Sequence, residues 1–483
     1  MTVHRLKFPA MFSFGFGQLA EAIKNSGFNV FLLFYYNQVL GVSATLTSVA
    51  LAIALMFDAV SDPLVGSFSD KLRTRFGRRH PLILMAALPL GLSFYCLFNP
   101  PSMTSDWAHF IWLLGFAILV RASLTLYHVP HLALGAEMAE DYHQRSTLYA
   151  MSTFFGFLGG ALFVPVSYTL FFPTTDVFNP ALLNKAAYQP WSLMAAGLMI
   201  FAIVVCVIGT RREIPRLVQR VDSDARQLMR VSALIQEFRE AFNNRSFRAI
   251  FFGMMLSTLV LSVEGVFNPF MGFHFWGLTT EQLRWIPLAQ LAGLFLSLAL
   301  MPIMTRWLDK KRTLIVSALL VILNINIPIV LSLSGVSWFP AQGSQSLLIV
   351  LILSGLVTAV LAPIIFATLN SMFADIADEH ELDTGFRREG VIFSARSFAV
   401  KATSSMGLVF GGTLLDLIAF PRGALMGSVP EDTVWLLGFI AGPATSVFTV
   451  LGVLMYLGYR IDEQRHQDIK RQLKERLTSV PSP

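Results

Sequence analysis

Successive apolar runs, each long enough to cross a lipid bilayer, constrain this chain more than any other feature of its sequence. They lie near residues 10–40, 43–69, 80–98, 107–138, 143–172, 188–210, 246–275, 281–305, 313–333, 345–377, 391–419 and 433–459. A membrane-spanning helix needs about 20 largely apolar residues, and charged or Pro- and Gly-rich loops separate the runs. Since only 14% of the 483 residues are charged and 54% are hydrophobic, the sequence predicts an all-α integral membrane protein of 12 transmembrane helices.

The distribution of Lys and Arg predicts how the chain is oriented. Of the 36 basic residues, 29 lie in segments on one side of the spans, whereas three lie on the other: Lys185, Arg284 and Arg422. Loops rich in Lys and Arg stay in the cytoplasm. We therefore expect a multi-pass inner (plasma) membrane protein with both termini cytoplasmic. The first apolar run lacks a small-residue cleavage site, so no removed signal peptide is expected.

A long polar segment after the sixth span divides the chain. We predict an N-terminal six-helix bundle over 1–210, a central cytoplasmic loop with an amphipathic helix over 211–245, a C-terminal six-helix bundle over 246–460 and a cytoplasmic tail over 461–483. Two bundles of six helices are typical of transporters that bind their solute between the bundles near the bilayer midplane.

Two carboxylates lie inside the second span, where a charge is costly. Asp58 and Asp62 are four residues apart and share one helical face, with Ser61 beside them. Such a pair needs a shared proton, a basic neighbour or a bound cation. A cation or proton site is the preferred interpretation, and Thr125 of the fourth span could supply another oxygen. The alternative is a structural pair between Asp62 and a buried Arg or Lys.

A polar stripe follows one face of the fourth span, where Arg121, Thr125 and His128 are spaced four and three residues apart. Two interpretations stay open. The stripe lines a solute cavity, or Arg121 neutralises an aspartate of the second span and His128 is a satisfied buried histidine.

Further charges lie within other spans. The first span contains Glu21 and Lys24, the seventh contains Glu264 and the eleventh contains Lys401. Intramembrane charges mark solute or ion pathways unless they pair with one another. We therefore treat these four residues, with Arg121 and His128, as candidate substrate contacts, and structural ion pairs remain the alternative.

Several functional classes lack the residues they need. The sequence contains no Walker loop, GxSxG elbow, HExxH pair or CxxC cluster, so neither ATP-driven pumping nor common membrane-enzyme chemistry is expected. The two cysteines, Cys96 and Cys206, lie in apolar runs and are typical of small core residues. The basic residues follow topology rather than forming a nucleic-acid-binding domain. We expect no enzyme, no cofactor and no nucleic-acid partner.

The segment from Phe57 to Pro81, FDAVSDPLVGSFSDKLRTRFGRRHP, resembles the signature of the glycoside-pentoside-hexuronide:cation symporters, the melibiose-permease-like branch of the major facilitator superfamily. Similar agreement is found in SFGFGQLAEAIKNSGFNVFLLFYYNQVLG, LTLYHVP and DEHELDTGFRREGVIFSARSFAVKATSSMG, so the resemblance covers essentially the whole chain. It implies the major facilitator fold and alternating access about a central cavity.

The resemblance also implies residue roles. Asp58 and Asp62 match the cation-binding pair, Thr125 matches a threonine of the same site, and Lys401 matches a lysine near the cation and sugar sites. The coupling ion would be sodium or a proton, with lithium as a further possibility. A loop that latches one state of the bundles in this superfamily is matched by Gly66, Asp70, Lys71, Gly77, Arg78 and Arg79.

The chain departs from the melibiose permeases at the sugar-binding positions. Ala22 and His128 stand where those permeases carry aspartates, and Leu132 and Thr153 replace a tryptophan and an arginine. We therefore predict cation-coupled symport of a small polar solute, a glycoside, pentoside or hexuronide, by a protein that works as a monomer. The alternatives are an uncoupled facilitator or a lysolipid-like carrier on the same fold, and a sensor or scaffold that transports nothing.

Overall fold

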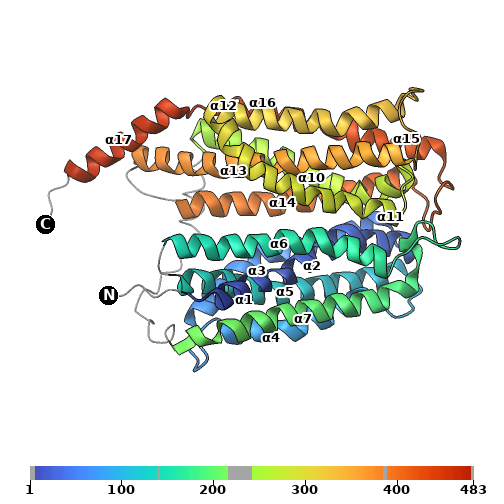
Figure 1. The fold of residues 1–483 in the computed structure, drawn as a ribbon, viewed down its shortest axis with the longest axis horizontal. Coiled ribbons are helices and arrows are strands. Elements are labelled where there is room, and N and C mark those ends of the chain that lie inside the picture. The colour runs from blue at the N-terminus through green and yellow to red at the C-terminus, as the bar shows by residue number, and fades with distance from the viewer. Residues whose placement is uncertain (1–5, 140–141, 216–241, 385–388, 480–483) are drawn as a thin grey trace. The chain divides into compact units, whose positions relative to one another are not determined.

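A computed structural model of the chain describes residues 6–139, 142–215, 242–384 and 389–479, all of which form helices and connecting loops (Figure 1). The first half contains α1 (Phe8–Gly17), α2 (Leu19–Ser26), α3 (Ala44–Lys71), α4 (His80–Leu97), α5 (Asp106–Met138), α6 (Tyr142–Leu170) and α7 (Tyr188–Thr210), with π-helical turns at Gly27–Leu32 and Tyr35–Val39. Single 3₁₀ turns lie at Ala181–Leu183, Lys185–Ala187 and Arg211–Glu213.

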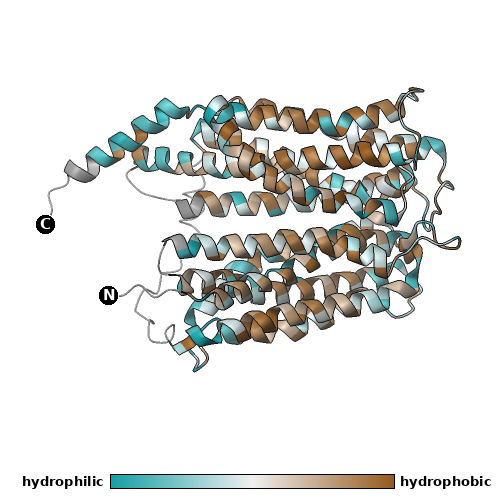
Figure 2. Ribbon diagram, viewed as in Figure 1, coloured by the Kyte–Doolittle hydropathy of each residue, from teal (hydrophilic) through white to brown (hydrophobic). Residues whose placement is uncertain are grey.

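The second half contains α10 (Arg245–Phe270), a π-helical turn (Met271–Phe275), α11 (Thr280–Leu283), α12 (Trp285–Leu333), α13 (Gln345–Thr384), α14 (Glu389–Leu417), α15 (Glu431–Phe439), a second π-helical turn (Ile440–Ala444), α16 (Thr445–Tyr456) and α17 (Glu463–Ser479). Hydrophobic residues concentrate along the shafts of the long helices, whereas hydrophilic ones gather at their ends and on α17 (Figure 2). The helices are thus built for a bilayer.

The helices match the predicted spans closely. Within the described residues, ten helical segments are long and apolar enough to cross a membrane. Two of the twelve predicted spans are not counted separately, each for a local reason. The first is broken into α1, α2 and π-helical turns, and α12 covers both predicted spans 281–305 and 313–333 across a kink at Asp309, where φ is 62°. The fold class predicted from the sequence is confirmed.

The chain divides into two compact units. The first, unit 1, consists of residues 1–224, 265–288 and 408–437, and the second, unit 2, of residues 225–264, 289–407 and 438–483. The bundle limits predicted at 1–210 and 246–460 remain a prediction. The amphipathic helix predicted in the central loop falls largely within 216–241, outside the described residues.

Aromatic side chains form much of the core of unit 1. Trp191 of α7 is fully buried, and Phe31 packs on it with ring centroids 4.6 Å apart, as does Phe98 at 4.8 Å. Helices approach closely beside this core: a Cβ at Gly27 would lie 2.6 Å from the Phe94 ring, closer than real side chains tolerate. This packing fixes the first span against α4 and α7, and so positions the polar residues that α2 carries.

A buried carboxylate organises unit 2. Asp375 of α13 accepts hydrogen bonds from Lys310 Nζ at 2.6 and 2.8 Å and from the Tyr459 hydroxyl at 3.0 Å, and His466 of α17 lies 3.3 Å away. Ile469 of α17 is fully buried in the adjoining hydrophobic cluster. The segment predicted as a tail therefore includes a helix that packs on its own unit.

Candidate functional site

Two polar pairs join α3 to α5 in unit 1. Arg121 Nη1 donates to Asp58 Oδ2 at 2.5 Å, and the Thr125 hydroxyl donates to Asp62 Oδ1 at 2.9 Å. The second pair lies about one helical turn from the first, because its members follow those of the first by four residues on each helix. Of the interpretations left open for Arg121, the structure has the guanidinium paired with an aspartate of the second span.

Unpaired oxygens lie next to these pairs. Asp58 Oδ1 and Ser61 Oγ are both buried and have no hydrogen-bond partner among the described residues. Because the two residues are three apart on α3, they lie on one helical face, beside Asp62. Buried polar atoms are usually satisfied, so these two orphans on one face make it a candidate site for a bound ion or water. Carboxylate and hydroxyl oxygens are the ligands that hard cations prefer.

A second polar chain runs from α5 to α2 and α6. His128 Nε2 lies 3.1 Å from Glu21 Oε2, and the Gln18 side-chain amide also donates to Glu21. The Ser152 hydroxyl of α6 donates to Gln18 Oε1 at 3.2 Å. Both Gln18 and Ser152 escaped the sequence analysis. Gln18 precedes Glu21 by three residues on the same face, and that spacing is the signal that could have identified it.

Lys24 is a buried cation, with 5% of its surface exposed. Its ammonium donates to Asn25 Oδ1 at 3.2 Å and lies 4.8 Å from the centre of the Phe28 ring, and Arg121 lies 5.3 Å from the same ring. The carboxylates of Asp58, Glu21 and Asp62 act electrostatically on this ammonium. A buried cation needs polar partners, and Lys24 is a candidate contact for a polar ligand.

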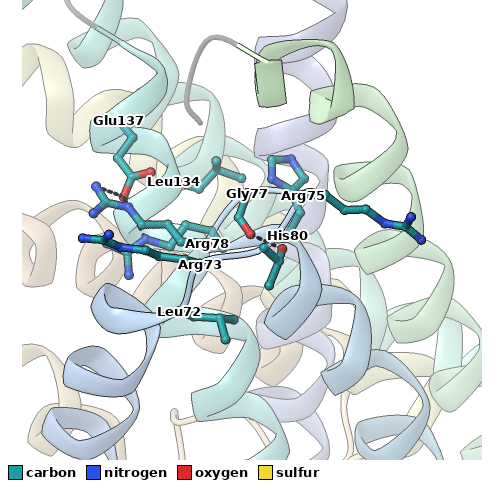
Figure 3. Close-up of a pocket in the computed structure, with 10 residues that line it drawn as sticks. Leu72, Arg73, Arg75, Gly77, Arg78, His80, Leu134 and Glu137 are labelled. Carbon is teal, nitrogen blue, oxygen red and sulfur yellow. Dashed lines mark hydrogen bonds and ion pairs between the residues drawn. The ribbon is translucent and has the colours of Figure 1, made fainter. Parts of the chain in front are cut away.

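The loop between α3 and α4 contains the predicted conformational motif. Arg79 binds Asp70 at 2.5 Å, the Ser69 hydroxyl at 2.7 Å and Glu137 at 2.8 Å, and Arg78 binds Glu137 at 3.0 Å. Figure 3 shows Glu137 beside the guanidinium group of Arg78. The pairing thus ties the ends of α3, α4 and α5 within one unit. Glu137 was missed because a single acid at a helix end is common in any sequence.

The remaining motif residues are structural or exposed. Gly77 has a φ of 80°, a conformation that side chains disfavour, and so allows the turn into α4. Gly66 lies on α3 near Val129, and Lys71 is exposed at the end of α3. The motif is therefore a turn stabilised by Arg and acid pairs.

A family model described as MFS/sugar transport protein matches residues 13–463. The chain belongs to this family. The protein is therefore a multi-pass membrane transporter of small molecules and not an enzyme, as the sequence predicted.

Characterised and uncharacterised relatives in this family are distant but cover the whole transporter. An uncharacterized symporter of Synechocystis is 24% identical over 99% of this chain and 98% of its own length. A glucuronide carrier protein homolog of Escherichia coli is 23% identical over 93% and 88%. A sodium-dependent lysophosphatidylcholine symporter of Gallus gallus is 22% identical over 92% and 85%. Two of these relatives are named symporters and one is named a carrier homolog.

A solved structure supports the fold. The crystal structure of the nucleoside transporter NupG matches with a TM-score of 0.57, at 14% identity, over 93% of this chain and 99% of that one. At this identity the likeness concerns the fold alone.

Unit 2 contains the other two candidate substrate residues of the transporter. Glu264 on α10 and Lys401 on α14 are each half-buried. Their roles in binding stay predictions, as do those of the unit 1 residues described above.

Proposed function

We propose that the protein is a secondary transporter that couples uptake of a small polar solute to a cation bound at Asp58, Ser61 and Asp62. The observation that carries this proposal is the pair of buried oxygens without partners, Asp58 Oδ1 and Ser61 Oγ. Carboxylate and hydroxyl oxygens are both ligands for a hard cation, so an alkali cation would satisfy the two atoms together. We therefore propose sodium as the coupling ion, and a proton shared between the two oxygens is the alternative that the experiment tests.

The charges around the site explain why a cation is needed for transport. Arg121 pairs with Asp58, and Asp62 accepts from the Thr125 hydroxyl. Carboxylates are costly to bury at this depth, and a bound cation lowers that cost. The transporter then exchanges between its outward and inward states with the site occupied.

The solute is proposed to be a glycoside, pentoside or hexuronide. Lys24 favours the last class, because a buried ammonium beside Asn25 and the Phe28 ring suits a carboxylate. The glucuronide carrier homolog among the relatives carries a solute of that chemistry by name. The lysophosphatidylcholine symporter among the relatives favours a second candidate, a lysolipid-like solute.

Orientation and assembly belong to the same proposal. The excess of Lys and Arg in segments on one side supports a cytoplasmic location for both termini. Transport by a monomer is part of the same proposal.

The decisive experiment measures uptake into proteoliposomes. Radiolabelled glycosides, pentosides and uronides are offered to the wild type and to Asp62→Asn, with an inward sodium gradient, an inward proton gradient or neither. We expect accumulation driven by sodium in the wild type and none in Asp62→Asn. Asp176→Asn, which alters an exposed loop carboxylate, serves as the control and should transport normally.

Other outcomes identify the alternatives. Accumulation driven only by the proton gradient would overturn the sodium site. Equal transport by both proteins without any gradient would leave an uncoupled facilitator. Uptake of lysophosphatidylcholine, with no uptake of the sugars, would establish the lysolipid carrier.

A further inference from the structure

A basic cavity opens at the end of unit 1 where α3 ends at Lys71 and α4 begins at His80. Its volume is about 420 Å³, and it lies apart from Asp58 and Asp62, closer to the ends of the helices. It is lined by Leu72, Arg73, Thr74, Arg75, Gly77, Arg78, Arg79, His80, Leu134 and Glu137.

The cavity carries more positive charge than its acids can balance. Arg78 and Arg79 share one carboxylate, that of Glu137, and Arg79 also binds Asp70. Arg73 is exposed, and no carboxylate in the described part of the chain pairs with it. A net positive cavity of this kind attracts an anion.

The side chains of the loop diverge. Arg73 and Arg78 extend to the side of the loop where Glu137 lies, whereas Arg75 points away to the opposite side (Figure 3). Arg75 instead lies 4.8 Å from the centre of the Phe76 ring. Two guanidinium groups on one side offer forked donors, the geometry that suits phosphate oxygens.

The loop is held in this form before any ligand binds. The Thr74 hydroxyl donates to the Gly77 carbonyl at 2.6 Å and accepts from the Phe76 N–H at 3.2 Å. A ligand then meets donors that are already ordered, which reduces the entropy lost on binding.

The position of the loop indicates where the anion comes from. The loop joins two candidate membrane spans, Ala44–Lys71 and His80–Leu97, and so lies at the depth of the lipid headgroups. Phe76 is 54% exposed beside Arg75, and aromatic and basic side chains are typical of that interface.

We propose that this cavity binds a phosphate group, supplied by the headgroup of an anionic phospholipid, with Arg73 and Arg78 donating to its oxygens. The site is separate from the coupling cation and its solute. It makes the stability of this end of unit 1 depend on the composition of the bilayer.

The test compares lipid binding by the purified full-length protein and two variants. Native mass spectrometry measures how much phosphatidylglycerol, and separately phosphatidylcholine, each protein retains from mixed micelles of stated composition. We expect wild-type protein to prefer phosphatidylglycerol. Arg73→Gln should weaken its affinity for phosphatidylglycerol by about fivefold, the contribution of one basic contact. Lys71→Gln removes the same charge from the exposed end of α3, outside the lining of the cavity, and should change the affinity little.

The two variants distinguish a specific lipid-binding site from non-specific electrostatic attraction of anionic lipid. An equal loss in Arg73→Gln and Lys71→Gln, or no preference for phosphatidylglycerol in the wild type, would overturn the proposal. Competition by glycerol phosphate tests the source of the phosphate group. If glycerol phosphate displaces phosphatidylglycerol at equal concentrations, the cavity binds a phosphate group but its ligand is a soluble phosphate ester. If glycerol phosphate does not displace phosphatidylglycerol, the result supports the lipid headgroup as the ligand.

Discussion

The Asp416 carboxylate of α14 caps the first turn of α3, where it accepts a hydrogen bond from the Thr45 N–H at 2.8 Å. It also accepts from the Ser43 hydroxyl at 2.6 Å and from the Ala44 N–H at 3.2 Å. The first N–H groups of a helix have no partner within it, and a negative charge at this end interacts favourably with the helix dipole. The helix that carries Asp58 and Asp62 is thus held at its start by a side chain far away in sequence.

Loss of this cap should destabilise the protein measurably. Asp416→Ala leaves two backbone N–H groups without their acceptor, and removing a capping side chain typically costs about 1 kcal/mol. We expect the Tm of the purified protein to fall by about 2–4 °C. Asp176→Ala removes an exposed carboxylate from a loop of the same unit and provides the control. An unchanged Tm for Asp416→Ala would mean that water replaces the cap without cost.

The pair of Asp58 and Arg121 should show strong coupling. Removing one partner leaves a buried charge uncompensated, at a cost of about 3–5 kcal/mol, whereas removing both leaves none. We expect Asp58→Asn and Arg121→Gln each to lower the Tm and the yield of monodisperse protein, and the double variant to be more stable than either. Additive losses in this double-mutant cycle would show that the two side chains do not depend on each other.

The sequence was sufficient for the fold because hydropathy and helix length are local properties. The apolar runs locate every membrane helix within a few residues, and the exceptions have local causes, such as the kink at Asp309 and the π-helical turns of the first span. Periodicity alone also placed Arg121 and Thr125 on one face of α5.

Periodicity could not predict which side chains Arg121 and Thr125 contact. Whether Arg121 pairs with Asp58 or lines a cavity depends on how α3 and α5 pack, which spacing within a single helix does not determine. The same holds for Glu137 and Asp416, whose roles arise from residues more than 50 positions away. An isolated acid at a helix end carries no distinguishing pattern until its neighbours are known.

The Thr125 hydroxyl should matter for affinity rather than for folding. It donates to Asp62 and so positions one carboxylate of the proposed cation site. Thr125→Val keeps the shape but removes the donor. We expect the sodium concentration that gives half-maximal uptake to rise by about tenfold, in line with a hydrogen bond to a charged group.

Thr125→Ser is the matched control, because it retains the hydroxyl and loses only a methyl group. It should keep the sodium dependence of the wild type. If Thr125→Ser and Thr125→Val shift the sodium dependence equally, the packing of the methyl group matters and the hydroxyl does not.

The two acids that bind Arg79 should differ in importance. The Glu137 side chain of α5 is 16% exposed and accepts from both Arg78 and Arg79, whereas the Asp70 side chain of α3 is 64% exposed and pairs with Arg79. Exposed ion pairs contribute about 0–1 kcal/mol, but hydrogen bonds to buried charges contribute about 1.5–3 kcal/mol each. Thermal unfolding of the purified proteins should therefore show a clearly lower Tm for Glu137→Gln and a nearly unchanged Tm for Asp70→Asn. The opposite order would mean that Asp70 holds the loop and that Glu137 contributes little.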